Sequence, residues 1–270
     1  MNGEFVAAEK RLNEVLESHS PLAIAVSGGV DSLTLATVAH CLLRVAPLMV
    51  HALSPAVPVA ATARVREMSA REGWDLREIA AGEFADPDYR ANPYNRCYYC
   101  KSNLYRSIRA MTDRQIASGA NVDDLSDYRP GLQAAAERHV IHPFIDARID
   151  KATIRQLARA HQLHHYSELP AQPCLASRVE TGLPIRARDL NFIDEFECEL
   201  KQTLGELATV RVRIREPGIY VELGQMLDQE TAPILEERAR RFCKDAGYQF
   251  IAITAYRQGS AFIRGKTTRA

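Results

Sequence analysis

The stretch that decides the fold is Leu22–Val26 (LAIAV), followed directly by Ser27-Gly28-Gly29-Val30-Asp31-Ser32 (SGGVDS). The apolar run has the length of a buried strand, and a helical pattern extends from Asp31 to about Leu43. Glycines between a strand and a helix let backbone N–H groups approach a phosphate, and the helix dipole favours the anion. An N-cap after a tight turn would explain Ser-Gly-Gly alone. The complete hexapeptide in this position predicts a phosphate-binding loop, which we call the phosphate loop.

Three side chains of the phosphate loop extend this prediction. The hydroxyl groups of Ser27 and Ser32 add hydrogen-bond donors, and the hard carboxylate oxygens of Asp31 suit a Mg²⁺ ion that bridges phosphates. The hexapeptide is neither a Walker A motif nor the dinucleotide motif G-x-G-x-x-G. It therefore indicates another class of nucleotide site.

Strands and helices alternate around this loop through the first 165 residues, which is typical of a parallel sheet covered on both faces. Ligands of such sheets bind at the carboxyl ends of the strands. Further strands are predicted at Leu48–Leu53, Leu76–Ala80, Gln115–Ser118 and His139–His142. Helices are predicted at Val59–Glu72, Cys100–Met111, Leu132–Arg138 and Lys151–His161, with residues 82–96 as a loop.

The pattern changes after His165, where a stretch rich in proline and glycine begins. It is followed by a helix at Ala187–Leu204, strands at Thr209–Arg215 and Tyr220–Leu223, a helix at Glu230–Ala246 and a strand at Gln249–Thr254. This order predicts a second, smaller α/β unit. We therefore expect an α/β fold with a parallel-sheet domain at 1–165 and a smaller domain at 166–270.

Composition narrows the functional classes. The chain has 270 residues, 46% of them hydrophobic and 25% charged, which is typical of a soluble globular protein and argues against global disorder. No stretch approaches the roughly 20 apolar residues of a membrane span, and no secretory signal pattern is visible, so we expect a cytoplasmic protein. Lys+Arg and Asp+Glu are both 34, so bulk charge predicts no nucleic-acid partner.

The phosphate loop resembles the PP-loop of the ATP pyrophosphatase superfamily. Its members cleave ATP between the α and β phosphates, adenylylate a substrate oxygen and displace AMP with a nucleophile. Amidating synthetases, argininosuccinate synthetase and tRNA thiolases belong to it. The resemblance implies ATP and Mg²⁺ at this loop and leaves the nucleophile open.

Further segments resemble the LarE sulfur transferases of the ExsB-like group, over about residues 15 to 260. They are Asn95–Lys101 (NRCYYCK), Gly119–Asp124 (GANVDD), Asp127–Gly131 (DYRPG), Pro173–Arg178 (PCLASR), and Val210–Arg213 (VRVR) with Glu222. That family adenylylates a carboxylate of a pyridinium dicarboxylate mononucleotide and inserts sulfur, giving a thiocarboxylate for a nickel-pincer cofactor. The resemblance implies an adenine nucleotide α-hydrolase-like domain, a C-terminal domain for substrate binding and oligomerisation, and a homo-oligomer.

Candidate nucleotide contacts follow the predicted strands. They are Ser27, Gly28, Gly29, Asp31 and Ser32 of the phosphate loop, Ser54 on the adenine side, and Gly119, Asp123 and Arg129. Helix capping would explain an Asp at position 123 equally well. The site therefore depends mainly on the phosphate loop.

Cys174 is the candidate sulfur source, because sulfur must arrive as a thiolate or sulfide. Ser177 and Arg178 follow it, and their polar and cationic groups favour a thiolate. A buried loop thiol is the alternative. We therefore assign catalytic roles to Cys174, Ser177 and Arg178 together with Asp31.

The predicted strand at Thr209–Arg215 carries arginines at alternate positions. Arg211 and Arg213, continued by Arg215, point to one face and could bind a phosphate or carboxylate bidentately. A solvated strand face is the alternative. Glu222 matches a family acid, and Glu197 and Glu199 compete for a second acidic position, for which Glu199 is our choice.

Cys97 and Cys100 have the C-x-x-C spacing of metal ligands or a redox pair, although structural accident would also explain it. With Cys174 they could hold a [4Fe–4S] cluster that leaves one iron open for sulfide. Sacrificial donation from Cys174, which leaves dehydroalanine, is the alternative. We expect the remaining thiols, Cys41, Cys198 and Cys243, to be core residues.

Other reactions of the superfamily predict other features. Amidation predicts a glutaminase domain or an ammonia channel, tRNA thiolation predicts a basic groove, and an AMP-binding regulator would lack the chemistry of Cys174. We expect a small nucleotide-like carboxylate as substrate, with neither nucleic acid nor membrane as a stable partner.

Overall fold

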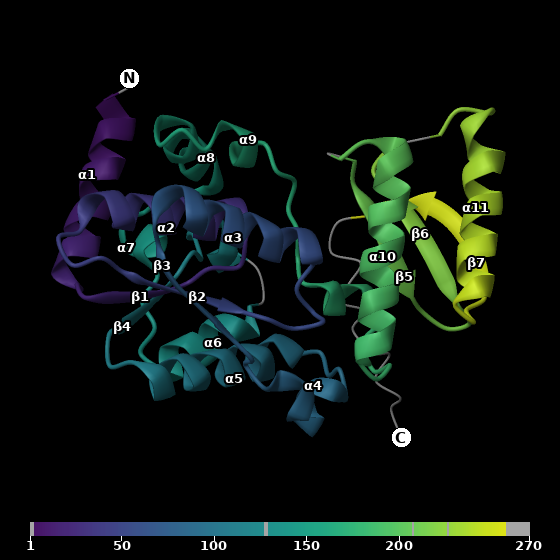
Figure 1. The fold of residues 1–270 in the computed structure, drawn as a ribbon, viewed down its shortest axis with the longest axis horizontal. Coiled ribbons are helices and arrows are strands. Elements are labelled where there is room, and N and C mark those ends of the chain that lie inside the picture. The colour runs from purple at the N-terminus through teal and green to yellow at the C-terminus, as the bar shows by residue number, and fades with distance from the viewer. Residues whose placement is uncertain (1–2, 127–128, 207, 226, 258–270) are drawn as a thin grey trace. The chain divides into compact units, whose positions relative to one another are not determined.

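The computed structural model describes residues 3–126, 129–206, 208–225 and 227–257 (Figure 1). The chain divides into two compact units. Unit 1 comprises Met1–Asp86 and Asn95–Gln172, and unit 2 comprises Pro87–Tyr94 and Pro173–Ala270. Of the helices within the described ranges, none has the length and hydropathy needed to cross a membrane.

Unit 1 is built on a parallel sheet with the strand order β3-β2-β1-β4. The strands are β1 (Leu22–Ala25), β2 (Leu48–Ala52), β3 (Asp75–Ile79) and β4 (Gln115–Ser118). Ala23 of β1 lies opposite Leu48 on one side and Ile116 on the other. This register brings the carboxyl ends of β1, β2 and β4 to one edge, where the phosphate loop begins.

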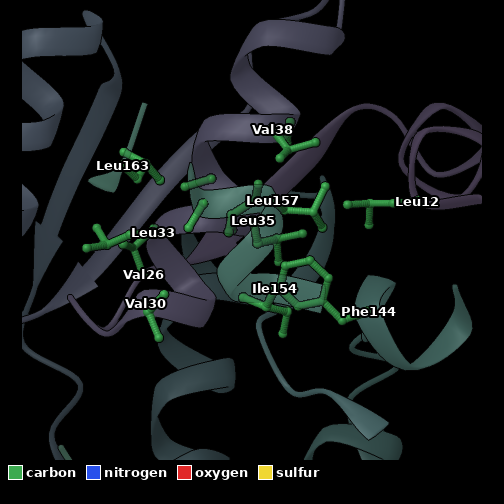
Figure 2. Close-up of a cluster of buried hydrophobic side chains, with 14 of the residues drawn as sticks. Leu12, Val26, Val30, Leu33, Leu35, Val38, Phe144, Ile154, Leu157 and Leu163 are labelled. Atoms are coloured by element: carbon green, nitrogen blue, oxygen red, sulfur yellow. The ribbon is translucent and has the colours of Figure 1, made fainter. Parts of the chain in front are cut away.

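Helices cover both faces of this sheet, as the strand–helix alternation predicts. On one face, α1 (Gly3–Ser18), α2 (Val30–Leu42), α7 (Pro143–Asp146) and α8 (Lys151–Ala160) contribute to one apolar core. Figure 2 shows Leu12, Leu33, Phe144 and Leu157 within it. On the other face, α5 (Arg96–Met111) and α6 (Pro130–Glu137) pack a second cluster. Leu22 and Ile24 belong to the first cluster and Ala23 to the second, because successive strand residues face opposite sides.

The strand predicted at His139–His142 is wrong. Only an isolated bridge joins Ile141 to Ala117. His139 has φ +54°, a left-handed conformation that interrupts extended backbone. Pro143 then begins α7 and has no N–H for a ladder. The apolar pair Val140–Ile141 is therefore too short to form more than one bridge.

Several helices lie outside the predicted elements. α1 precedes β1, the short helices η1 (Glu83–Ala85) and α4 (Pro87–Arg90) fall in the predicted loop, and α5 begins at Arg96 rather than Cys100. α3 (Val59–Glu72) and α10 (Ala187–Leu204) have the predicted ends. α9 (His164–Ser167) is a further single turn.

Unit 2 contains a three-stranded sheet with the order β5-β6-β7. β5 (Val210–Ile214) pairs antiparallel with β6 (Ile219–Leu223), which pairs parallel with β7 (Phe250–Ala255). α10 packs against β5 and α11 (Thr231–Asp245) against β7. Stacked aromatic rings join the helices, as Phe196 and Phe242 show with ring centroids 4.5 Å apart. The order of helices and strands agrees with the predicted second α/β unit.

Hydrogen bonds of Arg90 and Asn92 hold the segment Pro87–Tyr94 to the rest of unit 2; the Arg90 carbonyl accepts from the Ile185 N–H at 2.9 Å. The Asn92 side-chain amide donates hydrogen bonds to the carbonyls of Glu180 and Leu183, at 2.8 and 2.9 Å. The Gly182 N–H donates to the Asn92 carbonyl. The compact units therefore divide after Gln172 and include this excursion, whereas the functional division at 165 and 166 stays a prediction.

Candidate functional site

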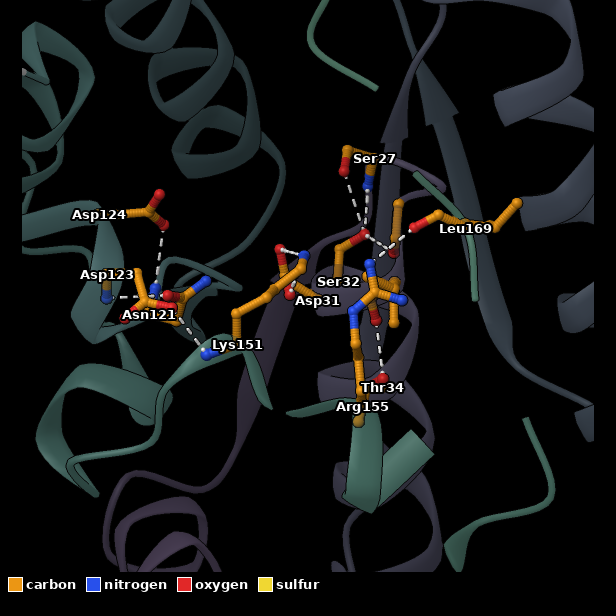
Figure 3. A network of polar contacts seen from close by, with 12 residues as sticks. Ser27, Asp31, Ser32, Thr34, Asn121, Asp123, Asp124, Lys151, Arg155 and Leu169 are labelled. Atoms are coloured by element: carbon orange, nitrogen blue, oxygen red, sulfur yellow. Dashed lines mark hydrogen bonds and ion pairs between the residues drawn. The ribbon is translucent and has the colours of Figure 1, made fainter. Parts of the chain in front are cut away.

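The phosphate loop lies between β1 and α2, and the Ser32 hydroxyl closes it (Figure 3). Ser32 Oγ accepts a hydrogen bond from the Ser27 N–H at 3.0 Å and donates to the Gly29 carbonyl at 3.1 Å. Ser27 Oγ lies 3.1 Å from Ser32 Oγ. Gly29 is the N-cap of α2, and no described side chain caps that terminus. The loop is thus a closed turn at a helix N-terminus, the arrangement that favours anions.

Close packing requires glycine at two positions around this loop. Gly28 has φ +78°, and a Cβ there would stand 2.4 Å from the Ala61 carbonyl oxygen of α3. A Cβ on Gly119, which follows β4, would stand 3.0 Å from the Ser32 backbone nitrogen. Gly119 therefore lets β4 approach the start of α2.

Lys151 is a residue of this site that the sequence interpretation missed. Its Nζ lies 2.7 and 2.6 Å from the two carboxylate oxygens of Asp31 (Figure 3). Burial raises the pKa of Asp31 above its ordinary value, and Lys151 opposes that shift. Lys151 is the first residue of α8, directly after its N-cap Asp150. A lysine in a first helical turn opposes the helix dipole, and this signal could have identified it.

The Gly119–Asp124 motif forms a turn that supports α8. The Asn121 N–H donates to Asp124 Oδ2 at 3.1 Å, and Asp123 Oδ2 accepts from the Lys151 backbone N–H at 3.0 Å. Arg129 forms an ion pair with Asp124 at 2.8 Å. Asp127 and Tyr128 of the next motif lie outside the described residues. These contacts give Asp123 and Arg129 structural roles, and their predicted nucleotide contacts stay predictions.

Ser54 lies in the turn that follows β2. Its Oγ accepts a hydrogen bond from the Ala56 N–H at 3.0 Å, and its carbonyl accepts one from the Val57 N–H at 2.9 Å. Ser54 therefore shapes this turn at the carboxyl edge of the sheet. Its contact with adenine stays a prediction.

His51, a buried residue of β2, contacts Val26, the residue directly before the phosphate loop. Its Nδ1 lies 2.8 Å from the Val26 carbonyl and its Nε2 lies 2.9 Å from Thr62 Oγ1. Because a carbonyl only accepts, Nδ1 carries the proton and Nε2 accepts from the Thr62 hydroxyl. Burial lowers the pKa of His51. A neutral imidazole thus joins the end of β1 to α3.

In unit 2, Arg178 organises the Pro173–Arg178 turn, which we call the Cys174 turn. Its guanidinium makes a bidentate pair with Glu197 of α10, at 2.9 and 3.1 Å, and both side chains are almost fully buried. Arg178 Nη1 also donates to the carbonyls of Pro173 and Cys174 and to Ser177 Oγ. Cys174 itself is exposed, so the alternative of a buried loop thiol is wrong. Removing one partner of such a buried pair costs about 3–5 kcal/mol.

Arg211 and Arg213 of β5, and Arg215 directly after it, lie on one side with Glu222 of β6. We call this side the arginine face. Arg213 Nε and Arg215 Nη2 contact the two Glu222 oxygens at 2.9 and 2.6 Å. Arg213 also donates to the Ser177 carbonyl at 2.7 Å, and Arg211 lies over the Tyr256 ring. Arg211, Arg213 and Glu222 are at most 5% exposed, so the alternative of a solvated strand face is wrong.

The two competing glutamates have different surroundings. Glu197 is buried against Arg178 and accepts from the Val212 N–H at 3.0 Å. Glu199, our choice from the sequence, instead forms an ion pair with Arg238 of α11. Glu197 is therefore the member of the pair that belongs to the Arg178 cluster. A substrate-binding role for Glu199 stays a prediction.

The cysteines are distributed over both units. Cys97 and Cys100 are half-buried residues in the first turns of α5 in unit 1, and Cys174 belongs to unit 2. Among the residues that the structure describes, no three His, Cys, Asp or Glu side chains form a metal-binding group. Of the three predicted core thiols, only Cys243 is buried. Cys41 and Cys198 are exposed on α2 and α10, which corrects that prediction.

The parallel sheet with SGGVDS at the carboxyl end of β1, followed by a smaller sheet, defines an α/β protein whose fold is compatible with a PP-loop domain. No family profile matches the chain. It is 36% identical over 204 residues to the uncharacterized protein slr1717 of Synechocystis. The aligned region covers 74% of this chain and 75% of slr1717. The chain belongs to the same family as slr1717.

Two more distant relatives are an uncharacterized protein and a synthase. The uncharacterized protein MJ0830 of Methanocaldococcus jannaschii is 28% identical over 60% of this chain and 63% of its own. Pyridinium-3,5-bisthiocarboxylic acid mononucleotide synthase of Lactiplantibacillus plantarum is 24% identical over 254 residues, 92% of this chain and 88% of that protein. The chain is thus a distant relative of an enzyme whose product contains thiocarboxylates.

Proposed function

We propose that this protein is an ATP-dependent sulfur transferase that adenylylates a carboxylate of a pyridinium dicarboxylate mononucleotide and converts it to a thiocarboxylate. The observation that carries the proposal is the phosphate loop, a closed turn at the N-terminus of α2 whose Asp31 pairs with Lys151. The relationship to a bisthiocarboxylic acid mononucleotide synthase supports the same class of substrate.

In the first step, a carboxylate oxygen of the substrate attacks the α-phosphorus of ATP and pyrophosphate leaves. The amides at the start of α2 and the hydroxyls of Ser27 and Ser32 would bind the phosphates. Asp31 presents hard carboxylate oxygens that fit Mg²⁺. In this structure the Lys151 ammonium neutralises that carboxylate. Mg²⁺, where bound, would neutralise charge on the departing pyrophosphate, and Lys151 would then be available to the phosphates.

In the second step, sulfur attacks the acyl adenylate and AMP leaves. With the Cys174 thiolate as nucleophile, the product is a thioester on the protein. Loss of the Cα proton and cleavage of the Cβ–S bond would then release the thiocarboxylate and leave dehydroalanine. The exposure of Cys174 and the bonds from Arg178 to its turn support this role. The arginine face would bind the phosphate or free carboxylate of the substrate.

A [4Fe–4S] cluster on Cys97, Cys100 and Cys174 is the alternative sulfur source. Its candidate ligands belong to different units, Cys97 and Cys100 to unit 1 and Cys174 to unit 2. The family resemblance and the C-x-x-C spacing keep this route as a proposal.

The test is anaerobic purification with iron and sulfide assays, followed by intact mass after turnover with ATP and the dicarboxylate mononucleotide. Sacrificial transfer predicts little iron and the loss of one H₂S from Cys174, whereas the cluster route predicts iron, sulfide and an unchanged Cys174. Cys198 is also exposed, so the Cys198→Ser variant is the matched control for assigning the mass change to Cys174. The absence of both pyrophosphate and thiocarboxylate would refute the proposed function.

A further inference from the structure

Arg64 of α3 joins two segments of unit 1 that lie far apart in the sequence. Its Nε donates a hydrogen bond to the Gly28 carbonyl at 2.9 Å, and its Nη2 donates to Gln172 Oε1 at 2.5 Å. Gly28 belongs to the phosphate loop, and Gln172 is the last residue of unit 1, just before the Cys174 turn. One guanidinium thus contacts both the predicted ATP site and the segment that leads to the candidate sulfur donor.

The bond to Gly28 orients a peptide that a phosphate would use. The Gly28 carbonyl and the Gly29 N–H belong to one planar trans peptide, so they point in opposite directions. By directing the carbonyl toward α3, Arg64 directs the Gly29 N–H away from α3. Gly29 is the N-cap of α2, and the described side chains leave that terminus without a cap. The same bond also polarises the peptide and strengthens its N–H as a donor.

The phosphate loop needs such an external constraint because adjacent glycines can adopt many backbone conformations. α3 supplies it at two points. The Ala61 carbonyl occupies the space where a Gly28 side chain would be, and Arg64 lies three residues later on the same helix face. α3 therefore acts as a support for the loop, with Arg64 as its directional contact.

From this geometry we infer that Arg64 is a positioning residue of the polyphosphate site. It holds the Gly28–Gly29 peptide in the orientation that binds the triphosphate and links that peptide, through Gln172, to the segment entering the Cys174 turn. This inference rests on the proposed ATP-dependent function. It adds a residue outside every motif of the sequence, since Arg64 lies in the middle of α3.

The test compares Arg64→Met with Arg66→Met in the full chain. Arg66 lies on the same helix but is mainly exposed and pairs with Glu78 of β3, so it is a matched control. Binding of Mg²⁺–ATP and of inorganic pyrophosphate is measured by calorimetry. A hydrogen bond from a charged donor is worth about 1.5–3 kcal/mol, so R64M should weaken ATP binding roughly 10- to 100-fold. R66M should change it by less than about twofold.

Kinetics separate positioning from general loss of structure. In R64M the KM for ATP should rise roughly 10- to 100-fold, like the dissociation constant, and kcat for pyrophosphate release should stay nearly unchanged. The reason is that the lost contact between Arg64 and Gly28 serves ATP binding. A loss of folded protein would instead lower the apparent kcat and leave KM unchanged. R64K keeps the charge but lacks the planar fork that reaches two partners, so its ATP affinity should fall between those of R64M and the wild type.

The outcomes distinguish the inference from the function on which it rests. A wild type that binds neither ATP nor pyrophosphate overturns the proposed function and the inference with it. A wild type that binds ATP, with a folded R64M that binds equally well, overturns the inference alone. If R64M does not fold by circular dichroism, R64K decides: wild-type affinity in R64K overturns the inference, and weakened affinity supports it.

Discussion

Lys151 and Asp31 form an ion pair at the phosphate loop, where the proposed function would bind a polyphosphate. The Asp31 carboxylate lies at the start of α2, where the helix dipole stabilises negative charge, and Lys151 lies at the start of α8, where the dipole opposes its charge. The pair therefore places a cation where the backbone alone would not favour one. An incoming polyphosphate would satisfy Lys151, and a divalent cation would satisfy Asp31.

Replacing Asp31 with alanine should abolish pyrophosphate release, because the carboxylate is the candidate Mg²⁺ ligand at the phosphate loop. We expect a fall of at least about 100-fold in kcat/KM, in line with the loss of one preorganised charged group. A pyrophosphate assay on D31A and on the exposed-site control Asp113→Ala measures it. Unchanged release in D31A would refute the assigned phosphate site.

His51 predicts how stability depends on pH. Burial lowers the pKa of His51 below its ordinary value of 6.5, so the unfolded chain binds a proton more readily than the folded chain. Stability should therefore be complete above pH 6.5 and should decrease as the pH falls from there through the folded-state pKa. Because one proton is involved, the free energy of unfolding should change by at most about 1.4 kcal/mol per pH unit.

Urea unfolding of the wild type and of His51→Gln between pH 7.5 and 5.5 measures this contribution. Gln keeps a donor and an acceptor but does not titrate in this range, so H51Q should lose part of the pH dependence. Parallel curves for the two proteins would show that His51 does not supply it.

At the scale of elements, β1 and β2 could be predicted because they are short, mostly buried apolar runs. β3 is mainly exposed, and the strand expected at His139–His142 does not form. The burial of Glu197 could also be predicted from the sequence. Ile193 lies four residues before it and Leu200 three residues after it, which places all three on the buried side of α10. The arginine face follows from alternation along β5. The contacts of Arg64 with Gly28 and Gln172 are distant in the sequence, so residue patterns do not show them. The place of Lys151 in a first helical turn is a signal in the sequence, but its pairing with Asp31 is not.

Asn92 is a fully buried side chain of the segment Pro87–Tyr94. Asn92 has φ +54°, which asparagine tolerates better than most residues. Asn92→Ala should destabilise unit 2 by about 1–3 kcal/mol, because the fully buried Asn92 amide is lost and the part-buried carbonyls of Glu180 and Leu183 lose their donor. Urea unfolding against the exposed Asn191→Ala control measures it. Equal stability of the two variants would contradict this role.

At the scale of the whole molecule, the two half-reactions of the proposed function would depend on residues of different units. The phosphate loop belongs to unit 1 and the Cys174 turn to unit 2. Cys174→Ser should therefore keep substrate-dependent pyrophosphate release within about threefold and lose thiocarboxylate formation, because only the nucleophile changes. Parallel assays of pyrophosphate and product measure this, with Cys198→Ser as control. Loss of both activities in C174S alone would contradict this separation.

Because Pro87–Tyr94 belongs to unit 2, two separate stretches of the sequence form that unit, and this affects how the protein can evolve. Because unit 2 is encoded by two separate stretches, a single recombination point near residue 172 cannot exchange the unit intact. Such a hybrid would keep the old Asn92 opposite new carbonyls. Coordinated change at both stretches is needed, so the small segment and the C-terminal residues should evolve together, and the two units should diversify less independently than domains joined end to end.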